Sequence, residues 1–117
     1  MKNLFIILTL LSSVFSQMAL AGANTPTAKI DTLNIGAVVW VTLKDGNSNT
    51  ISFDPTGCAN DPDTFALPKT GNENFDQIFR GLLLARGTDS NIKIWVTGCY
   101  EHHNGKIRPT IDGVNVL

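Results

Sequence analysis

TGNENFDQIFRGLLLARG, residues 70–87, decides the fold, because it is the one clear helix that the chain predicts. Its apolar residues recur at the spacing of a single helix face. They are Phe75, Ile78, Phe79, Leu82 and Leu83. Thr70 and Glu73 have the spacing of an N-terminal capping box, and Arg86 followed by Gly87 is typical of a helix end. We therefore expect one amphipathic helix in the second half of the chain.

Three strand patterns precede this helix. Residues 29–43 alternate apolar and polar side chains with many β-branched residues, which predicts a long strand. The dipeptide Asp45-Gly46 tolerates the positive φ of a tight turn, so we expect residues 50–53 to pair back. Residues 54–63 form a loop with two prolines. A short strand around residues 65–67 follows it.

Two strand patterns follow the helix. Residues 92–97 alternate, with Ile92, Ile94 and Val96 on one side. Residues 107–117 form the last strand, in which Pro109 and Gly113 predict an edge position or a bulge.

The predicted order is therefore strand, strand, short strand, helix, strand, strand. One helix cannot cover both faces of an open five-stranded sheet, so we expect a mainly β fold in which the sheet curls into a small barrel capped by the helix. This order is that of the five-stranded oligonucleotide/oligosaccharide-binding barrel (OB-fold). The alternative is an open α+β sheet with the helix across one face.

The first residues predict export. Lys2 precedes an apolar run over residues 4–15, and Ala19-Leu20-Ala21 supplies small residues for a signal peptidase, so residues 1–21 read as a secretory signal peptide. We expect residues 22–28 to be a flexible leader and residues 29–117 to be a single domain. The mature protein would then be periplasmic or secreted, with no membrane insertion after signal cleavage.

Charge and composition exclude some partners. Nine lysines and arginines stand against ten aspartates and glutamates, and the net charge is −1. The cations form no basic stripe, so nucleic acid and anionic membrane surfaces are poor candidates.

Cys58 and Cys99 are the two cysteines of the chain. An even number of cysteines in an exported protein predicts a disulfide bond between them. Closing the long loop between them would stabilise the domain by roughly 4 kcal/mol on the chain-entropy model.

The segment from Cys99 to Gly105 also holds Glu101, His102 and His103. Adjacent histidines on a strand point to opposite faces, and an oxidised cysteine cannot bind zinc, so we predict no metal site and no cofactor here. A polar hairpin turn explains the segment instead. A cysteine–histidine dyad would need a free thiolate, and no G-x-S-x-G motif occurs, so we predict no catalytic residues and no enzyme activity.

Trp40 and Trp95 lie out of phase with the apolar residues of their strands. If Val39 and Val41 face the core, Trp40 faces outward, and the same holds for Trp95 between Ile94 and Val96. Exposed aromatic side chains stack on sugars or anchor a protein partner, so both are candidate ligand-binding residues. The alternative is that each ring is buried in a smaller cluster.

Several segments together carry a resemblance to known proteins. They are Ile30, Leu33 and Ile35 leading to Val39-Trp40-Val41, then Cys58, Leu82-Leu83-Leu84-Ala85, Ile92-Lys93-Ile94-Trp95-Val96-Thr97-Gly98-Cys99, and the closing Ile111, Val114 and Val116. In this layout the chain resembles small exported proteins of Gram-negative bacteria that have no assigned function. More distantly it resembles the B subunits of subtilase-cytotoxin-type toxins. That resemblance implies an OB-fold, assembly into rings and binding of cell-surface glycans.

We therefore expect a secreted, non-catalytic binding module, with a glycan as the first candidate ligand. A homo-oligomer is one candidate state, because Leu84 lies away from the apolar face of the predicted helix and could contact another subunit. The alternative is a periplasmic protein-interaction or inhibitor subunit.

Overall fold

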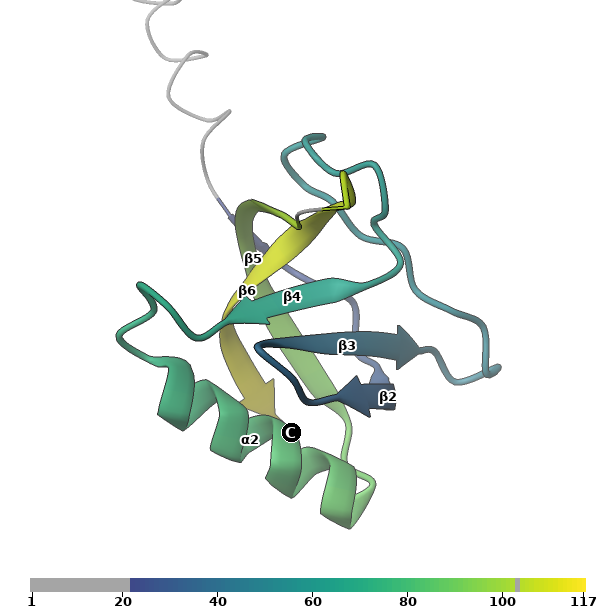
Figure 1. Ribbon diagram of the computed structural model, residues 1–117. Coiled ribbons are helices and arrows are strands. Elements are labelled where there is room, and N and C mark those ends of the chain that lie inside the picture. The colour runs from purple at the N-terminus through teal and green to yellow at the C-terminus, as the bar shows by residue number, and fades with distance from the viewer. Residues whose placement is uncertain (1–21, 103) are drawn as a thin grey trace, which may run out of the picture.

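The computed structural model describes residues 22–102 and 104–117, so the predicted signal peptide, residues 1–21, lies outside the described residues. Within them, one helix, α2 (Phe75–Thr88), packs against one six-stranded sheet (Figure 1). The strands are β1 (Ala23–Asn24), β2 (Lys29–Asn34), β3 (Val38–Lys44), β4 (Phe65–Pro68), β5 (Ile92–Glu101) and β6 (Ile107–Val116). The predicted mainly β fold with one helix is confirmed for this part of the chain.

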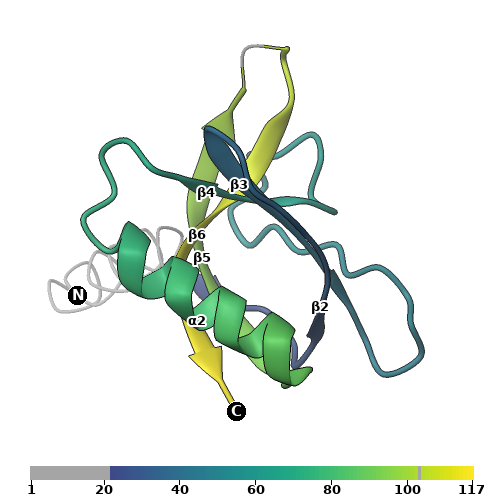
Figure 2. The ribbon, with the colours of Figure 1, turned by 60° about the horizontal axis from the view of Figure 1, so that its bottom comes forward.

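The sheet has the strand order β1-β5-β6-β4-β3-β2. All neighbouring pairs are antiparallel except β4 and β6, which are parallel at Ala66 and Thr110. The consecutive strands β1 and β2 thus lie at opposite ends of the order. Between them, Ala28 forms an isolated bridge with Ile92 of β5, through N–H···O bonds of 2.9 and 2.7 Å. The sheet is therefore strongly curled, and α2 lies across one end of it (Figure 2).

The prediction of a closed five-stranded barrel is not confirmed. The described residues form six strands in an open sheet, because the contact between its two ends is a bridge at Ala28 rather than a full ladder. The order of the described strands is thus that of an open sheet with one helix. The sixth strand, β1, is too short to show an alternating pattern in the sequence.

Residues 22–28 were expected to be a flexible leader, but Ala23, Asn24 and Ala28 pair with β5. The Thr25 amide donates to the carbonyl of Ile94 at 2.8 Å, and the Thr25 hydroxyl accepts from the Ile94 amide at 3.0 Å. Thr25 and Ala28 are both buried. The hydroxyl replaces a backbone acceptor, which explains how a small polar segment completes the sheet.

The core lies between the curled sheet and α2. Side chains of β3 and of β5 up to Val96 alternate as predicted, with the odd positions of β3 and the even positions of β5 facing inward. The fully buried ones are Val39, Val41, Leu43, Ile92, Ile94 and Val96. From the helix, Ile78, Leu82 and Ala85 complete the core.

Two strand predictions are wrong in detail. The long strand over residues 29–43 is two strands, because the chain reverses at residues 35–37 and β2 pairs with β3. Ile35 lies in this reversal and is 54% exposed. Residues 50–53 form no strand, although Thr50 bridges Lys44 and Ile51 packs against the edge of the core.

The helix ends also differ from the prediction. Asn74 is the N-cap and its side chain makes no capping bond, so the predicted Thr70–Glu73 capping box is not formed. Gly71 has a φ of 75°, which turns the chain between Thr70 and the helix. At the other end the helix continues past Gly87 to Thr88, and its C-cap, Asp89, adopts the left-handed conformation that aspartate tolerates. Among the described residues, no helix has the length and hydrophobicity that crossing a bilayer requires.

Gly81 allows the helix to approach β6 closely, and its replacement tests this packing. A Cβ atom at position 81 would lie 2.7 Å from Cγ1 of Val114. Alanine favours a helix over glycine by about 1 kcal/mol, but overpacking costs about 1–3 kcal/mol. We therefore expect Gly81→Ala to lower the free energy of unfolding in urea. In a Val114→Ala background, the same change should stabilise the protein; destabilisation there would contradict this packing.

The ion pair between Lys29 and Asp89 fastens β2 to the end of α2, with Nζ and Oδ2 3.0 Å apart. The hydrogen bond from Lys29, and then its charge, hold the pKa of Asp89 below its ordinary value of 3.8. Because the pKa is lower in the folded state, the pair stabilises the fold above pH 3.8, and this contribution is lost as the pH falls through the folded pKa.

We expect Lys29→Met to raise the pKa of Asp89, as measured by NMR titration of its carboxyl carbon. Lys93→Met, which removes the same charge elsewhere, should leave the value unchanged. An equal pKa in wild type and Lys29→Met would show that the ion pair does not form in solution.

Candidate functional site

A bulge in β5 decides which side chains form the candidate site. Val96 pairs with Ile111, whereas Cys99 pairs with Pro109, so β5 holds one extra residue in this interval. Gly98 takes up the irregularity with a φ of 82°. Because side chains alternate between the two faces of a strand, one extra residue reverses the alternation beyond it. Tyr100, opposite Arg108, is thereby brought to the outer face.

Trp40 is the centre of a cluster on this outer face. It shares the face with Ala66, its partner in β4, which is fully buried. The guanidinium carbon of Arg108 lies 4.4 Å from the centroid of the Trp40 ring, a cation–π geometry. The His102 ring meets the indole edge-on, with centroids 5.2 Å apart, and the Tyr100 ring is tilted at 6.2 Å. The half-buried indole of β3 is thus contacted by side chains of β5 and β6 and by His102, which follows β5.

A cleft of ≈ 390 Å³ opens beside this cluster. We name it the Trp40 cleft. It is lined by Thr32, Asn34, Trp40, Thr42, Thr64, His102, Asn104 and Arg108. The volume is within the range of small-ligand sites, but the lining is mostly hydroxyl, amide and cationic groups rather than hydrocarbon. No carboxylate is among these lining residues. The cleft therefore suits a ligand rich in hydrogen-bonding groups.

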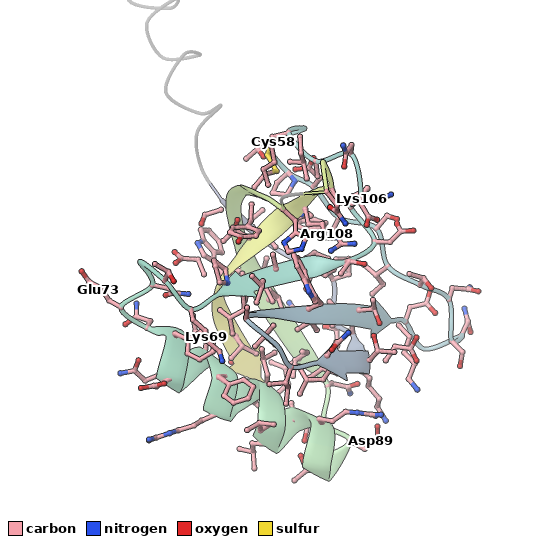
Figure 3. All side chains as sticks on the ribbon, in the orientation of Figure 1. Cys58, Lys69, Glu73, Asp89, Lys106 and Arg108 are labelled. Carbon is pink, nitrogen blue, oxygen red and sulfur yellow. A yellow bond between two sulfur atoms is a disulfide. The ribbon has the colours of Figure 1, made fainter. Side chains whose placement is uncertain are left out.

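Asp61 holds Arg108 in place. Its Oδ2 accepts from Nε of Arg108 at 2.9 Å, and the two side chains are only 24% and 17% exposed. The neighbouring Asn60 is bonded to the β5–β6 hairpin through the amide and carbonyl of Ile107 and the carbonyl of Gly105. Figure 3 shows Arg108 on the outer face of the sheet, near the loop that carries Cys58. The loop therefore orients the cation of the cleft.

The predicted disulfide is present between Cys58 and Cys99. It joins the loop over residues 54–63 to the bulged half of β5, with the two Cα atoms 6.1 Å apart. The bond thus fastens the segment that supplies Asp61 to the strand that supplies Tyr100.

The two tryptophans predicted as ligand contacts lie apart. Trp40 lines the cleft, whereas Trp95 of β5 is 38% exposed and does not line it. Trp95 pairs instead with Asn24 and Gly113. Both rings face away from the core, as the alternation of their strands indicates.

Sequence reasoning missed Arg108 and Tyr100 as site residues. Arg108 alternates with Ile107 and Pro109, so a strand pattern could have placed it on the outer face. For Tyr100 the simple alternation gives the wrong face, because the extra residue near Gly98 reverses it.

Among the described residues, His102 is not grouped with the cysteines as a set of metal-ligating side chains. His102 lies against Trp40, and His103 lies outside the described residues. Asp54, Cys58 and Cys99 have ligand-type atoms within 4.8 Å of one another, but both sulfurs belong to the disulfide. The predicted hairpin turn is present: the amide of Gly105 donates to the carbonyl of His102 at 2.9 Å.

A second hollow of ≈ 340 Å³ lies between the segment before α2 and β6. It is lined by Pro68, Thr70, Gly71, Asn72, Glu73, Asn74, Thr110, Ile111 and Asp112. It holds no aromatic ring on which a ligand could stack, so we take the Trp40 cleft as the candidate site.

Comparison with known proteins found no matching family model, no similar curated protein and no similar solved structure. We therefore base the function on the geometry of the cleft.

Removal of the disulfide should destabilise the domain strongly. The bond closes a loop over a sequence separation of 41, so the chain-entropy model predicts a loss of about 4 kcal/mol in the free energy of unfolding for the double variant Cys58→Ser/Cys99→Ser. Urea denaturation under oxidising conditions measures this loss. Wild type in a reducing buffer should match the variant, and two titratable thiols in native wild type would contradict the bond itself.

Proposed function

We propose that this chain is an exported, non-catalytic binding module that holds a glycan in the Trp40 cleft. The observation that carries the proposal is the half-buried indole of Trp40 at the edge of a cleft lined mainly by hydrogen-bonding groups. An aromatic ring and neighbouring polar groups together match the two kinds of surface that a sugar ring presents.

The chemistry of the lining favours a sugar over an apolar ligand. Asn34 carries a donor and an acceptor, and Arg108 keeps nitrogen donors beyond the one that binds Asp61. Asn104 carries amide donors, while its Oδ1 accepts from the amide of Lys106 at 3.1 Å. Thr32 and Thr42 already bond to each other, which fixes their hydroxyls across the β2–β3 pair. A polyhydroxylated ligand can pair with such groups, whereas a hydrocarbon would leave them unsatisfied.

The disulfide supports export. A small domain that holds a disulfide fits an oxidising compartment, where such bonds persist. The proposed location is the periplasm or the exterior, with residues 1–21 as the signal peptide.

For the finer architecture we propose a barrel of the OB type. Three observations support it: the parallel pairing of β4 with β6, the bridge from Ala28 to Ile92 between the two ends of the sheet, and the place of α2 between β4 and β5 in the chain. In this interpretation residues 23–34 act as one bent strand that pairs with β5 and then with β3.

A second candidate function is an interaction subunit that binds protein through its helix. Leu83 and Leu84 are 43% and 58% exposed on α2, and Leu117 is 60% exposed. Exposed large apolar side chains favour a protein contact. Mass measurement in solution, together with pull-down from the native envelope, separates this function from that of a monomeric glycan binder.

Glycan binding is tested with an array of glycans followed by titration of the hits, monitored by tryptophan fluorescence. We expect Trp40→Ala to weaken binding by about 30-fold, the effect of losing a buried aromatic anchor. Trp95→Ala is the matched control, since Trp95 does not line the cleft, and should change the affinity by less than about twofold.

An equal loss of glycan affinity in both tryptophan variants would show that the glycan does not bind in the Trp40 cleft. Absence of any glycan hit, with a partner protein captured by wild type and lost in Leu84→Ser, would replace the glycan proposal by the second function.

A further inference from the structure

The disulfide lies beside a carboxylate that the loop holds in a fixed position. One oxygen of Asp54 and the sulfurs of Cys58 and Cys99 lie within 4.8 Å of one another. Oδ1 of Asp54 accepts from the amides of Thr56 and Gly57 at 3.2 and 3.0 Å, and Oδ2 accepts from the amide of Ala59 at 2.8 Å. The carboxylate is therefore not a mobile surface group, since three backbone donors orient it toward the sulfur pair.

Thr56 adds to the negative character of this environment. Its hydroxyl donates to Oδ1 of Asp54 at 3.1 Å and lies 2.8 Å from Sγ of Cys58. Because the single hydroxyl proton is directed at Asp54, the oxygen faces the sulfur with a lone pair. A second electron-rich atom thus borders the same sulfur.

The two sulfurs differ in access. Cys58 is exposed in the loop, whereas Cys99 is half-buried in β5. Attack by an external thiolate at Sγ of Cys58 would form a new S–S bond there and break the bond to Cys99. The electron pair would leave with the Cys99 sulfur, which would take a proton from water. A second molecule of the same thiol then releases Cys58 as a thiol. Two thiols are oxidised to one external disulfide while the protein disulfide is reduced.

We propose that Cys58 is a site of thiol–disulfide exchange at which Asp54 selects the attacking thiol by its charge. Attack brings a negative sulfur towards the carboxylate, and the departing Cys99 thiolate develops its charge beside the same group. Thiolates with an additional negative charge are disfavoured most, and thiolates balanced by a cation are disfavoured least. The bond thereby resists anionic thiols and yields to cationic ones. This selection does not depend on glycan binding.

Three thiols of equal chain length test the selection on the folded, oxidised protein. As thiolates, 2-mercaptoethanesulfonate carries two negative charges, 2-mercaptoethanol carries one, and 2-aminoethanethiol is net neutral. Second-order rate constants per thiolate are followed by mass spectrometry at low ionic strength. Each is divided by the constant of the same thiol with a small uncharged disulfide, which removes differences in nucleophilicity, and the ratios should rise in wild type in that order. In Asp54→Asn the constant for 2-mercaptoethanol should rise about fourfold, the effect of one unit charge at about 5 Å in water. The increase should be larger for the sulfonate and below about twofold for the amine.

Asp45→Asn is the matched control. Asp45 also accepts backbone amides in a loop, those of Asn47 and Asn49, so its replacement makes the same charge change in a turn of the same kind. We expect wild-type rates for all three thiols in this variant.

A charge effect also predicts that 1 M salt reduces the differences among the three rate constants in wild type, because salt screens the carboxylate. This measurement uses wild type alone, so its result does not depend on whether Asp54→Asn loosens the loop. An equal acceleration of all three thiols in Asp54→Asn, or a wild-type ranking unaffected by salt, would overturn the selection by charge.

Discussion

The bond between Cys58 and Cys99 is the constraint on which the site depends. Residues 54–63 contain neither helix nor strand, so no ladder of backbone hydrogen bonds holds the whole segment. The disulfide joins this loop to β5, and the neighbouring Asn60 then bonds to the β5–β6 hairpin. The loop acquires a defined place on the sheet, and Asp61 is delivered to Arg108.

The bulge at Gly98, next to Cys99 in β5, decides which side chains of β5 lie on the outer face of the sheet. Gly98 accommodates an extra residue in β5, which exchanges the faces of the positions that follow it. Cys99 consequently lies opposite the buried Pro109, where it can meet the loop, and Tyr100 joins the outer face. The extra residue in β5 therefore places Cys99 for the disulfide and Tyr100 for the aromatic cluster around Trp40. A regular strand would exchange these two side chains between the faces.

Much of the fold could be predicted from the sequence, and the errors have specific causes. The helix, β4 and the inward positions of β3 and β5 follow from periodicity, because burial of one face imposes that pattern on the residues. The reversal at residues 35–37 was missed because the apolar alternation continues through Ile35. The role of residues 22–28 was missed because Thr25 and Ala28 are small, and only their partners Ile94 and Ile92 make them part of the sheet.

The candidate site was less accessible to prediction than the fold. Trp40 could be proposed because its strand is regular and the parity argument holds there. Arg108 can be recognised as a site residue only from its stacking on Trp40 and its ion pair with Asp61. These two partners come from separate parts of the chain. The sequence alone determined the mainly β class, the single helix, the pairing of the only two cysteines and the outward direction of both tryptophans, since these follow from local periodicity and residue chemistry. Only the tertiary structure decided that one tryptophan lines a polar cleft and the other does not, because a cleft is formed where strands distant in the chain lie side by side.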